Sequence, residues 1–492
     1  MVRDSFDENK QPAINIISRI ISLLFLAVSV FFIFKLSILN FLPTKYFFLI
    51  IALAIFLNIV LFLISFHRRT KKITLFIYDF FAVILSIGMI FGSFKIGEID
   101  TFIKKNFDDN KKYAVYNVIV SEKSSVDELS DLKGSELFTY EEPVKEITND
   151  ELREVAKNVI ADSTLVFRED LDKVMNRVTS LVDTASVVNN GTYESYISVH
   201  EDYEKQVKIV GEIKIEIKSE GKVEDDKETL ANTSFLLLIS GIDTRTGTMP
   251  SRSLSDVNIV AAVNPKAKKI LLVAIPRDSY VQLHGISGLP DKLTHAGSRG
   301  GVELTKTTIE DFLDIEFNRY IRVNFNFVTG LVDNIGGITV TNDLNRTLYL
   351  DGCTYRIGDN NVNGKCALRF ARERKSYESG DRHRGENQEQ VITRIIEKIS
   401  SDKNLVLDYN KILNSLDGSF DSDIDSDDIS ALVKMQLDDM SSWTVESYNI
   451  NGSGAYAKTN SYPGQDLYVM MTDTNTVNTA KEKIKATLNA TK

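Results

Sequence analysis

Cysteine and histidine are scarce in this sequence, with two cysteines and five histidines among 492 residues. Cys353 and Cys366 fit neither a zinc-binding spacing nor a CxxC redox motif. A calcium loop is also excluded, because the aspartate-rich run at 421–425 is followed by serine and leucine where that loop needs glycine and glutamate. We expect these aspartates to cap a helix at 429–437 instead.

A nucleotide-binding P-loop and an excess of positive charge are missing as well. Gly358 and Gly364 are one residue too far apart for a P-loop, and no serine or threonine follows Lys365. The 58 Lys and Arg residues are outnumbered by 68 Asp and Glu residues, which gives a net charge of −10. This balance argues against a nucleic acid partner, although it leaves room for a local basic site.

Three long apolar runs lie near the start of the chain, at 20–39, 46–66 and 73–94. Each has about 20 residues, which is enough to cross a bilayer core of ~30 Å. We therefore predict three transmembrane helices. Asp79 is costly to bury in the third run, and we expect it to cap this helix, with a partner on a neighbouring helix as the alternative.

The orientation of these helices follows from the positions of lysine and arginine. The basic connection at 67–72 and the N-terminal residues Arg3, Lys10 and Arg19 should stay in the cytoplasm. No cleavage site for a signal peptidase follows the first run before the next one begins. We therefore expect a multi-pass protein of the cell membrane whose chain after about residue 95 is extracellular.

The remaining chain is long enough for about two further domains at ~150 residues each. Alternating strand patterns at 113–121 and 207–217 enclose helical patterns at 148–161 and 171–185, which predicts a small α/β domain. A polar, charged run then reads as a linker. We expect a membrane anchor at 1–108, an extracellular accessory domain at 109–218, a linker at 219–233 and a layered α/β domain at 234–492.

The last domain begins with three strand-like runs at 235–240, 256–264 and 269–275, followed by alternating helices and strands. This alternation predicts a mostly buried sheet covered by helices, with its site in the loops beyond the strand ends. Asp243 follows the first run, Asp256 opens the second and Arg277 follows the third, so one edge of the sheet could carry all three.

Two carboxylates at one edge repel each other unless they are protonated or bridged by a cation. Mg²⁺ suits that role, because it takes oxygen ligands and connects carboxylates to phosphate oxygens. The simpler interpretation is that Asp243 and Asp256 are each a turn or cap residue.

Five arginines lie within the sixteen residues from 369 to 384. A guanidinium stays charged at physiological pH and matches phosphate oxygens in a planar fork, so converging arginines need an anion between them. The alternative is a solvated helix face on which the arginines pair with acidic neighbours.

The spacing within this segment favours an anion site. Arg372 and Arg374 would point about 200° apart on a regular helix, so they face the same way only where the helix predicted at 363–370 unwinds. If Asp381 begins the next helix, Arg384 lies in its first turn, where the free amides and the dipole favour an anion. We expect Arg369 and Arg382 to face solvent.

The chain resembles the LytR–CpsA–Psr family, in its capsule-associated branch with three transmembrane helices. The resemblance covers essentially the whole chain, and the combination of motifs is specific although each motif alone is weak. The motifs are SGIDT (240–244), SDVNI (255–259), IPRDS (275–279), NIGGI (334–338) and RERKSYESGDRHRGENQ (372–388).

This resemblance implies a phosphotransferase that moves a glycopolymer from a polyprenyl-pyrophosphate carrier to peptidoglycan. It implies that Asp243 and Asp256 hold Mg²⁺ (or Mn²⁺), that Asp243 and Arg374 are catalytic, and that the carrier's tail lies in an apolar tunnel. The pyrophosphate would be bound by Arg277, Arg372, Arg374, Arg384 and Gln388, with support from Asp381. Asp243 is a candidate general base and His383 a weaker one.

One motif departs from the family pattern. The family has Arg-Ser-Asp at the second aspartate, whereas Leu254 and Ser255 precede Asp256 here. Either Arg252 reaches the site from a longer loop, or one family contact is missing.

Two other functions remain open from the sequence. The same site could hydrolyse the lipid pyrophosphate, or the protein could be a non-enzymatic regulator or assembly factor that acts with membrane proteins of capsule synthesis. The two cysteines are also open, because an exported domain allows either a Cys353–Cys366 disulfide or two buried thiols.

Overall fold

The computed structural model describes residues 11–39, 42–67, 70–104, 111–142, 145–200, 202–217, 229–244, 248–378, 380–407, 412, 416 and 418–491. The chain folds as two compact units. The first unit contains Met1–Asp108 and Asp425–Met440, and the second contains Asp109–Ile424 and Ser441–Lys492.

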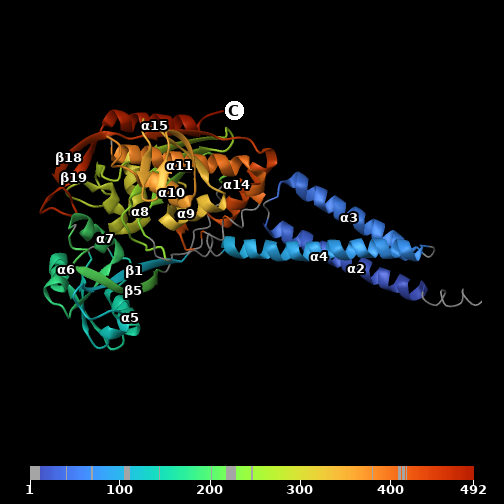
Figure 1. Cartoon of the computed structure of the whole chain (residues 1–492), viewed down its shortest axis with the longest axis horizontal. Helices are drawn as coiled ribbons and strands as arrows, with labels where there is room; N and C mark the ends of the chain where they lie inside the picture. The colour runs from blue at the N-terminus through green and yellow to red at the C-terminus, as the bar shows by residue number, and fades with distance from the viewer. Residues whose placement is uncertain are drawn as a thin grey trace, which may run out of the picture. The chain divides into compact units, whose positions relative to one another are not determined.

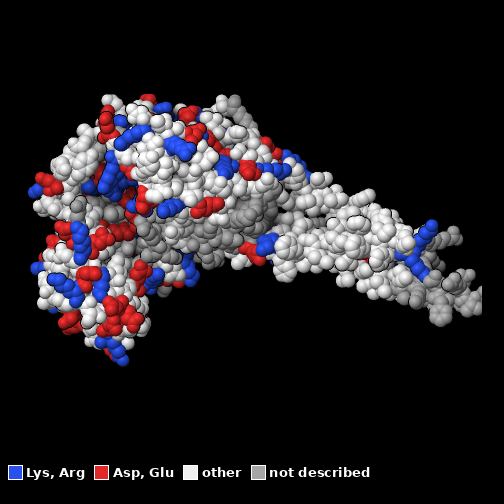
Figure 2. All heavy atoms as spheres, viewed as in Figure 1, with Lys and Arg blue, Asp and Glu red and all other residues white. Residues whose placement is uncertain are grey.

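The first unit is built from the long helices α2 (Gln11–Leu39), α3 (Thr44–Phe66) and α4 (Lys72–Ile103), with α14 (Ser426–Asp439). Three stretches, 14–38, 44–66 and 72–98, are long and apolar enough to cross a membrane. Most of their large apolar side chains are exposed, and Figure 2 shows uncharged atoms along most of their length. The three predicted helices are confirmed, and they form a membrane anchor.

Asp79 lies inside α4, and the prediction that it caps this helix is wrong. The cap position is held by Lys71, whereas Asp79 Oδ1 accepts a hydrogen bond of 2.8 Å from Ser18 Oγ on α2. Ser18 is also 2.9 Å from Ser65 Oγ on α3. A carboxyl among apolar residues needs such donors, so the polar group joins neighbouring helices.

Some residues from which the membrane orientation was predicted lie outside the described part of the chain. These are Arg3, Lys10, Arg68 and Arg69, and most of the expected linker, residues 218–228, does so too.

The accessory region of the second unit, in which Figure 1 labels β1 and β5, contains a five-stranded sheet in the order β3-β2-β4-β1-β5. Strand β1 pairs antiparallel with β4 and β5, and buried clusters lie on both faces of the sheet. The elements are β1 (Lys112–Ser121), η2 (Leu129–Leu132), β2 (Glu136–Tyr140), α5 (Asn149–Val159), β3 (Thr164–Arg168), α6 (Leu171–Ser180), β4 (Ala185–Asn189), α7 (Asn190–Val199) and β5 (Val207–Ile217).

The helix predicted at 171–185 is too long. It ends at Ser180, Leu181 is extended, and Thr184 N donates to Leu181 O in a turn that leads into β4. The apolar residues Leu181 and Val182 continue the helical periodicity, but their side chains are exposed. Periodicity alone therefore missed the stop.

The remaining region contains a mixed six-stranded sheet in the order β16-β11-β6-β7-β8-β17. The predicted layered α/β fold is confirmed, with α8 and α15 packing their apolar side chains on the buried cluster of this sheet. The sheet strands are β6 (Phe235–Gly241), β7 (Val257–Asn264), β8 (Lys269–Ala274), β11 (Arg319–Val323), β16 (Phe420–Ser422) and β17 (Thr444–Asn449).

Helices and short hairpins surround this sheet (Figure 1). The helices are α8 (Leu293–Leu313), α9 (Phe325–Asn334), α10 (Gly364–Arg372), α11 (Asp381–Ser401), α12 (Lys403–Leu407) and α15 (Thr474–Leu488). The smaller strands are β9 (Tyr280–Val281), β10 (Asp291–Lys292), β12 (Ile338–Asn342), β13 (Leu348–Leu350), β14 (Cys353–Tyr355), β15 (Gly358–Val362), β18 (Gly452–Lys458) and β19 (Asp466–Thr472).

The structure has a disulfide between the two cysteines and a helix cap in the aspartate-rich run. Cys353 and Cys366 form a disulfide, which joins β14 to α10 close to the arginine segment. A loop of this size contributes about 3 kcal/mol in the chain-entropy treatment. Asp425 caps α14 by accepting a hydrogen bond of 2.8 Å from Asp428 N, as predicted.

Candidate active site

Asp243, Asp256 and Arg277 lie at one edge of the central sheet. β6 and β7 are antiparallel, with Gly241 opposite Val257, so β6 ends where β7 begins. β7 and β8 are also antiparallel, and Ala274 at the end of β8 faces Ile259. The pairing of three consecutive strands thus brings the three side chains to the edge that the sequence predicts.

Each aspartate at this edge is held by an arginine. Arg277 Nη1 lies 2.9 Å from Asp256 Oδ1, and Arg372 Nη2 lies 3.1 Å from Asp243 Oδ2. The four side chains are between 23% and 44% exposed, so solvent and a ligand can reach them. Exposed ion pairs of this kind contribute about 0–1 kcal/mol, so a stronger anion can compete for the arginines.

Arg372 and Arg374 lie where α10 stops, as their spacing predicts. Arg372 is the last residue of the helix, and Glu373 has extended backbone angles (φ −71°, ψ 130°). The Arg372 guanidinium stacks over the Phe325 ring at 4.2 Å. Arg374 is exposed, and its guanidinium forms no ion pair or hydrogen bond with any described residue. The exposed Arg374 guanidinium is therefore available to a ligand, two residues beyond the arginine that pairs with Asp243.

The first turns of α11 form the wall of a small cavity at the same edge. Arg384 and Gln388 line it together with Asp256, Asn258 and Arg277. Gly385 permits the close approach of this helix, because a Cβ there would meet Asn449 Oδ1 at 2.9 Å. The helix N-terminus adds free amide donors and the positive end of its dipole, so the cavity favours an anion.

Three polar residues at this edge were not predicted: Asn258, Asn449 and Glu389. Asn258 is buried and donates to Ser255 O at 3.0 Å. Asn449 ends β17, which runs parallel to β8, and its Nδ2 donates to Glu389 Oε2 at 2.9 Å. Asn258 belongs to the SDVNI motif, and Asn449 could have been found because polar residues at strand ends gather at such sites.

Glu389 is a buried carboxyl directly behind the cavity. Burial raises the pKa of Glu389 to about 8, although hydrogen bonds from Asn449 Nδ2 and Ala274 N favour the charged form. At neutral pH this carboxyl therefore holds a proton for most of the time.

We expect Glu389→Gln to flatten the pH dependence of stability. The folded pKa of about 8 lies above the ordinary value of 4.5, so the stability that Glu389 contributes is complete below pH 4.5 and is lost as the pH rises towards 8. The glutamine variant should match the wild type near pH 5 and exceed it at pH 8 by at least about 1 kcal/mol. Denaturant unfolding at both pH values measures the free energy of unfolding of the wild type and the variant. The same difference between the two proteins at pH 5 and at pH 8 would contradict the prediction.

Arg252 does not take part in this edge of the sheet. Its side chain is 2% exposed, with Nη1 2.8 Å from Glu142 Oε2 and Nε 3.3 Å from Glu146 Oε2 of the accessory region. The sequence left open whether Arg252 reaches the site from a longer loop. In the structure it does not, so this family contact is missing.

The other charged residues of the arginine segment have separate partners. Arg369 pairs with Asp351, and Arg382 is 54% exposed and also borders the cavity. His383 stacks on Tyr377 with ring centroids 3.5 Å apart, and its Nδ1 lies 3.0 Å from Glu386 Oε2. The side chain of Asp381 lies outside the described part of the chain.

Asp243 and Asp256 are the carboxylates at this edge that would hold a cation. No group of three or more His, Cys, Asp or Glu side chains suited to a metal occurs among the described residues. Asp243 and Asp256 nevertheless sit side by side at the strand ends, since Asp256 N donates to Gly241 O at 2.9 Å. Mg²⁺ is commonly bound through one or two carboxylates plus substrate phosphates, so this donor set fits Mg²⁺ with an anionic substrate.

Comparison with known proteins gives consistent matches. The model of the LytR_cpsA_psr family matches residues 154–484. The "Polyisoprenyl-teichoic acid--peptidoglycan teichoic acid transferase TagU" of Enterococcus faecalis is 36% identical over 237 residues, which are 47% of this chain and 76% of that protein. The protein of the same name from Bacillus licheniformis is 33% identical over 231 residues, which are 47% of this chain and 72% of that protein.

A solved structure gives a similar match. The crystal structure of B. subtilis TagV is 28% identical, with a TM-score of 0.45, over 53% of this chain and 99% of that chain. The family model covers more than half of this chain, and the E. faecalis relative is matched over more than two thirds of its length. The chain belongs to the LytR–CpsA–Psr family.

Proposed function

We propose that this protein is a membrane-anchored phosphotransferase that attaches a capsular or other wall glycopolymer from a polyprenyl-pyrophosphate carrier to peptidoglycan. One observation carries the proposal: Arg277, Arg372 and Arg384 come from separate loops to the sheet edge that carries Asp243 and Asp256. Such a set of charges suits a pyrophosphate. The E. faecalis and B. licheniformis relatives are named as transferases of teichoic acid from a polyisoprenyl carrier to peptidoglycan.

The reaction exchanges one phosphorus–oxygen bond for another. A hydroxyl oxygen of peptidoglycan attacks the phosphorus that carries the glycopolymer, the bond from this phosphorus to the bridging oxygen breaks, and polyprenyl phosphate leaves. The hydroxyl proton passes to a base. Asp243 is the candidate when the cation does not engage both of its carboxylate oxygens, because its side chain is 44% exposed and pairs with Arg372. His383 is less suited, because its ring is stacked and only 13% exposed.

The arginines supply most of what this chemistry needs. Phosphoryl transfer depends on positioning and on neutralising charge more than on covalent help from the protein. Arg372 and Arg374 would bind the pyrophosphate from the end of α10, Arg384 and Gln388 from the start of α11, and Arg277 from the end of β8. The carrier brings the energy of its own anhydride, so no nucleotide is required.

We propose Mg²⁺, or Mn²⁺, as the cofactor, held by Asp243 and Asp256. A bound divalent cation would neutralise pyrophosphate charge and help to orient it. The two aspartates then serve to hold that charge close to the sheet edge, and the arginines remain available to the anion.

We propose that the second unit works outside the cell. The support is that the described residues contain three helices long and apolar enough to cross a membrane, together with the basic connection at 67–72. This topology fits substrates that are lipid-linked and wall-bound, with membrane proteins of capsule synthesis as further partners, and it leaves no nucleic acid within reach.

The proposal is tested with the full chain in lipid nanodiscs. It is incubated with a polyprenyl-pyrophosphate glycan and peptidoglycan fragments, with and without Mg²⁺, and the products are analysed by mass spectrometry. We expect a phosphodiester adduct of glycan and peptidoglycan that forms only with the cation. Free phosphorylated glycan without an adduct would identify a hydrolase instead, and no product at all would favour a regulator or assembly factor.

A further inference from the structure

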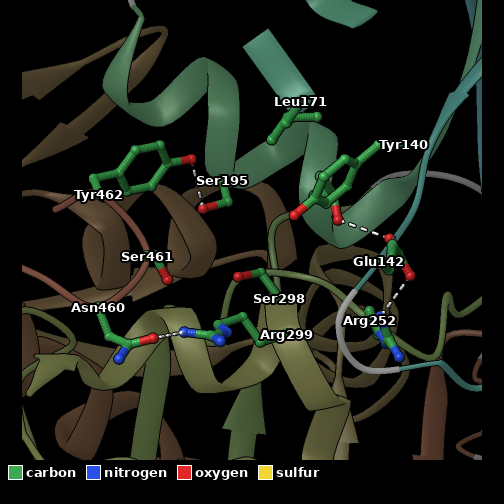
Figure 3. A pocket seen from close by; sticks show the side chains of 11 residues that line it. Tyr140, Glu142, Leu171, Ser195, Arg252, Ser298, Arg299, Asn460, Ser461 and Tyr462 are labelled. Atoms are coloured by element: carbon green, nitrogen blue, oxygen red, sulfur yellow. Dashed lines mark hydrogen bonds and ion pairs between the residues drawn. The ribbon is translucent and has the colours of Figure 1, made fainter. Parts of the chain in front are cut away.

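A second cavity lies away from the arginine site, between the accessory region and the rest of the same unit. Its volume is about 250 Å³, and residues from both regions line it (Figure 3). Tyr140, Thr192 and Ser195 come from the accessory side, whereas Ser298, Arg299 and the segment 460–462 come from the other side. None of these residues has a role in the proposed reaction.

Several hydroxyl groups in the wall of this cavity already donate their protons to hydrogen bonds within the protein. Thr192 Oγ1 donates to Glu142 Oε1 at 2.9 Å, and Ser461 Oγ donates to the buried Asp291 Oδ2 at 2.6 Å. Ser298 Oγ likewise donates to a backbone oxygen, at 3.1 Å. An oxygen that has given its proton to the protein can still accept, so the wall offers fixed acceptors.

One cation supplies donors in the same cavity. Arg299 is 22% exposed, its Nη1 donates to Asn460 Oδ1 at 2.6 Å, and Asp291 Oδ2 is 3.8 Å away. A guanidinium has five N–H groups, so most of them remain for a ligand. Figure 3 shows Arg299 facing the space below Ser195.

Two tyrosines complete the cavity from opposite ends (Figure 3). The Tyr462 hydroxyl is 3.0 Å from Ser195 Oγ, and its ring contacts His295 edge to face, with centroids 5.7 Å apart. A tyrosine presents an apolar ring with a polar tip. Tyr140 and Tyr462 therefore add apolar surface to a wall that otherwise consists of donors and acceptors.

We propose that this cavity binds a carbohydrate, with one or two pyranose rings between Tyr140 and Tyr462. A sugar has hydroxyls that both donate and accept on an apolar ring skeleton, which matches fixed acceptors, the Arg299 donors and tyrosine rings. The volume is below the ~300–1,000 Å³ of pockets for drug-sized ligands, so it suits a small segment of a chain. This assignment deepens the proposed function, on which it rests, because both substrates of that reaction carry glycans.

The cavity also connects to the arginine site through one loop. Arg252 lines the cavity, and Asp256 follows four residues later. The buried Glu194 of α7 accepts hydrogen bonds from Ser253 Oγ at 2.6 Å and from Leu254 N at 2.8 Å. A sugar in the cavity would therefore contact the loop that places Asp256.

The test measures binding of two sugar probes to the full chain in nanodiscs by titration calorimetry. One probe is the GlcNAc–MurNAc disaccharide of peptidoglycan, and the other is a wall polysaccharide fragment released from the same cells. Binding of either probe supports the site and identifies its source. Arg299→Ala should weaken the binding probe at least ten-fold, and Tyr462→Phe, which keeps the ring, should weaken it less.

The matched control is Arg153→Ala, which changes an arginine of the accessory region that has a 50% exposed side chain and is not among the residues that line the cavity. Absence of binding by both probes, or equal affinities for Arg299→Ala and Arg153→Ala, would overturn the proposal. The transfer assay separates the two hypotheses. Sugar binding without transfer leaves the site intact and rejects the proposed function, whereas transfer without sugar binding does the reverse.

Discussion

Arg374→Ala is expected to lower the rate of transfer by about 100-fold to 1,000-fold, the loss typical when one preorganised donor to developing charge is removed. The reason is that its guanidinium has no partner among the described residues and follows by two residues Arg372, which ends α10 and pairs with Asp243. Because the side chain is exposed, the stability should change by no more than about 0.5 kcal/mol. Arg374→Lys keeps the charge but loses the planar fork, so its transfer rate should lie between those of the wild type and Arg374→Ala.

The control for this prediction is Arg369→Ala in the same segment. Arg369 is also an arginine near the end of α10, but it pairs with Asp351 in the turn between β13 and β14. Single-turnover rates with a polyprenyl-pyrophosphate glycan, and unfolding curves for each variant, make the comparison. If Arg374→Ala and Arg369→Ala transfer at the same rate, Arg374 does not bind the pyrophosphate.

The sequence predicted where several of these residues lie, because local rules determine their placement. Strand ends placed Asp243, Asp256 and Arg277 at one edge, since neighbouring antiparallel strands bring such ends together. The two-residue spacing of Arg372 and Arg374 required an unwound helix end, and Glu373 is extended there. These inferences needed only the periodicity of helices and strands.

Features that depend on distant parts of the chain could not be predicted in the same way. Asn449 reaches the cavity because β17 lies parallel to β8, and no local pattern reports which strands become neighbours. The partners of Arg252 are more than a hundred residues away along the chain, in the accessory region. Asp79 took its partner from another helix for the same reason. In each case the position or partner of the residue was determined by contacts between distant parts of the chain, which local sequence propensity does not report.

Arg252→Ala is expected to destabilise the second unit by about 3–5 kcal/mol, the usual cost of removing one partner of a buried ion pair. Arg252 is 2% exposed and is within 3.3 Å of two carboxylates, Glu142 and Glu146. Glu142 is only 10% exposed, and burial already raises its pKa despite the nearby guanidinium. Without Arg252 that carboxylate would be charged, buried and poorly compensated.

The loss of stability from Arg252→Ala should increase with pH, which would identify the buried charge of Glu142 as its cause. Removing the cation raises the pKa of Glu142 further, so the variant is least affected at about pH 4, where the carboxyl is protonated, and loses stability as the pH rises to 8. Adding Glu142→Gln should recover part of the loss at pH 8, because the buried charge is then absent. Denaturant unfolding of the full chain measures both effects, with Arg153→Ala as the exposed control. A loss below about 1 kcal/mol, or one independent of pH, would show that this ion pair does not hold the loop before Asp256.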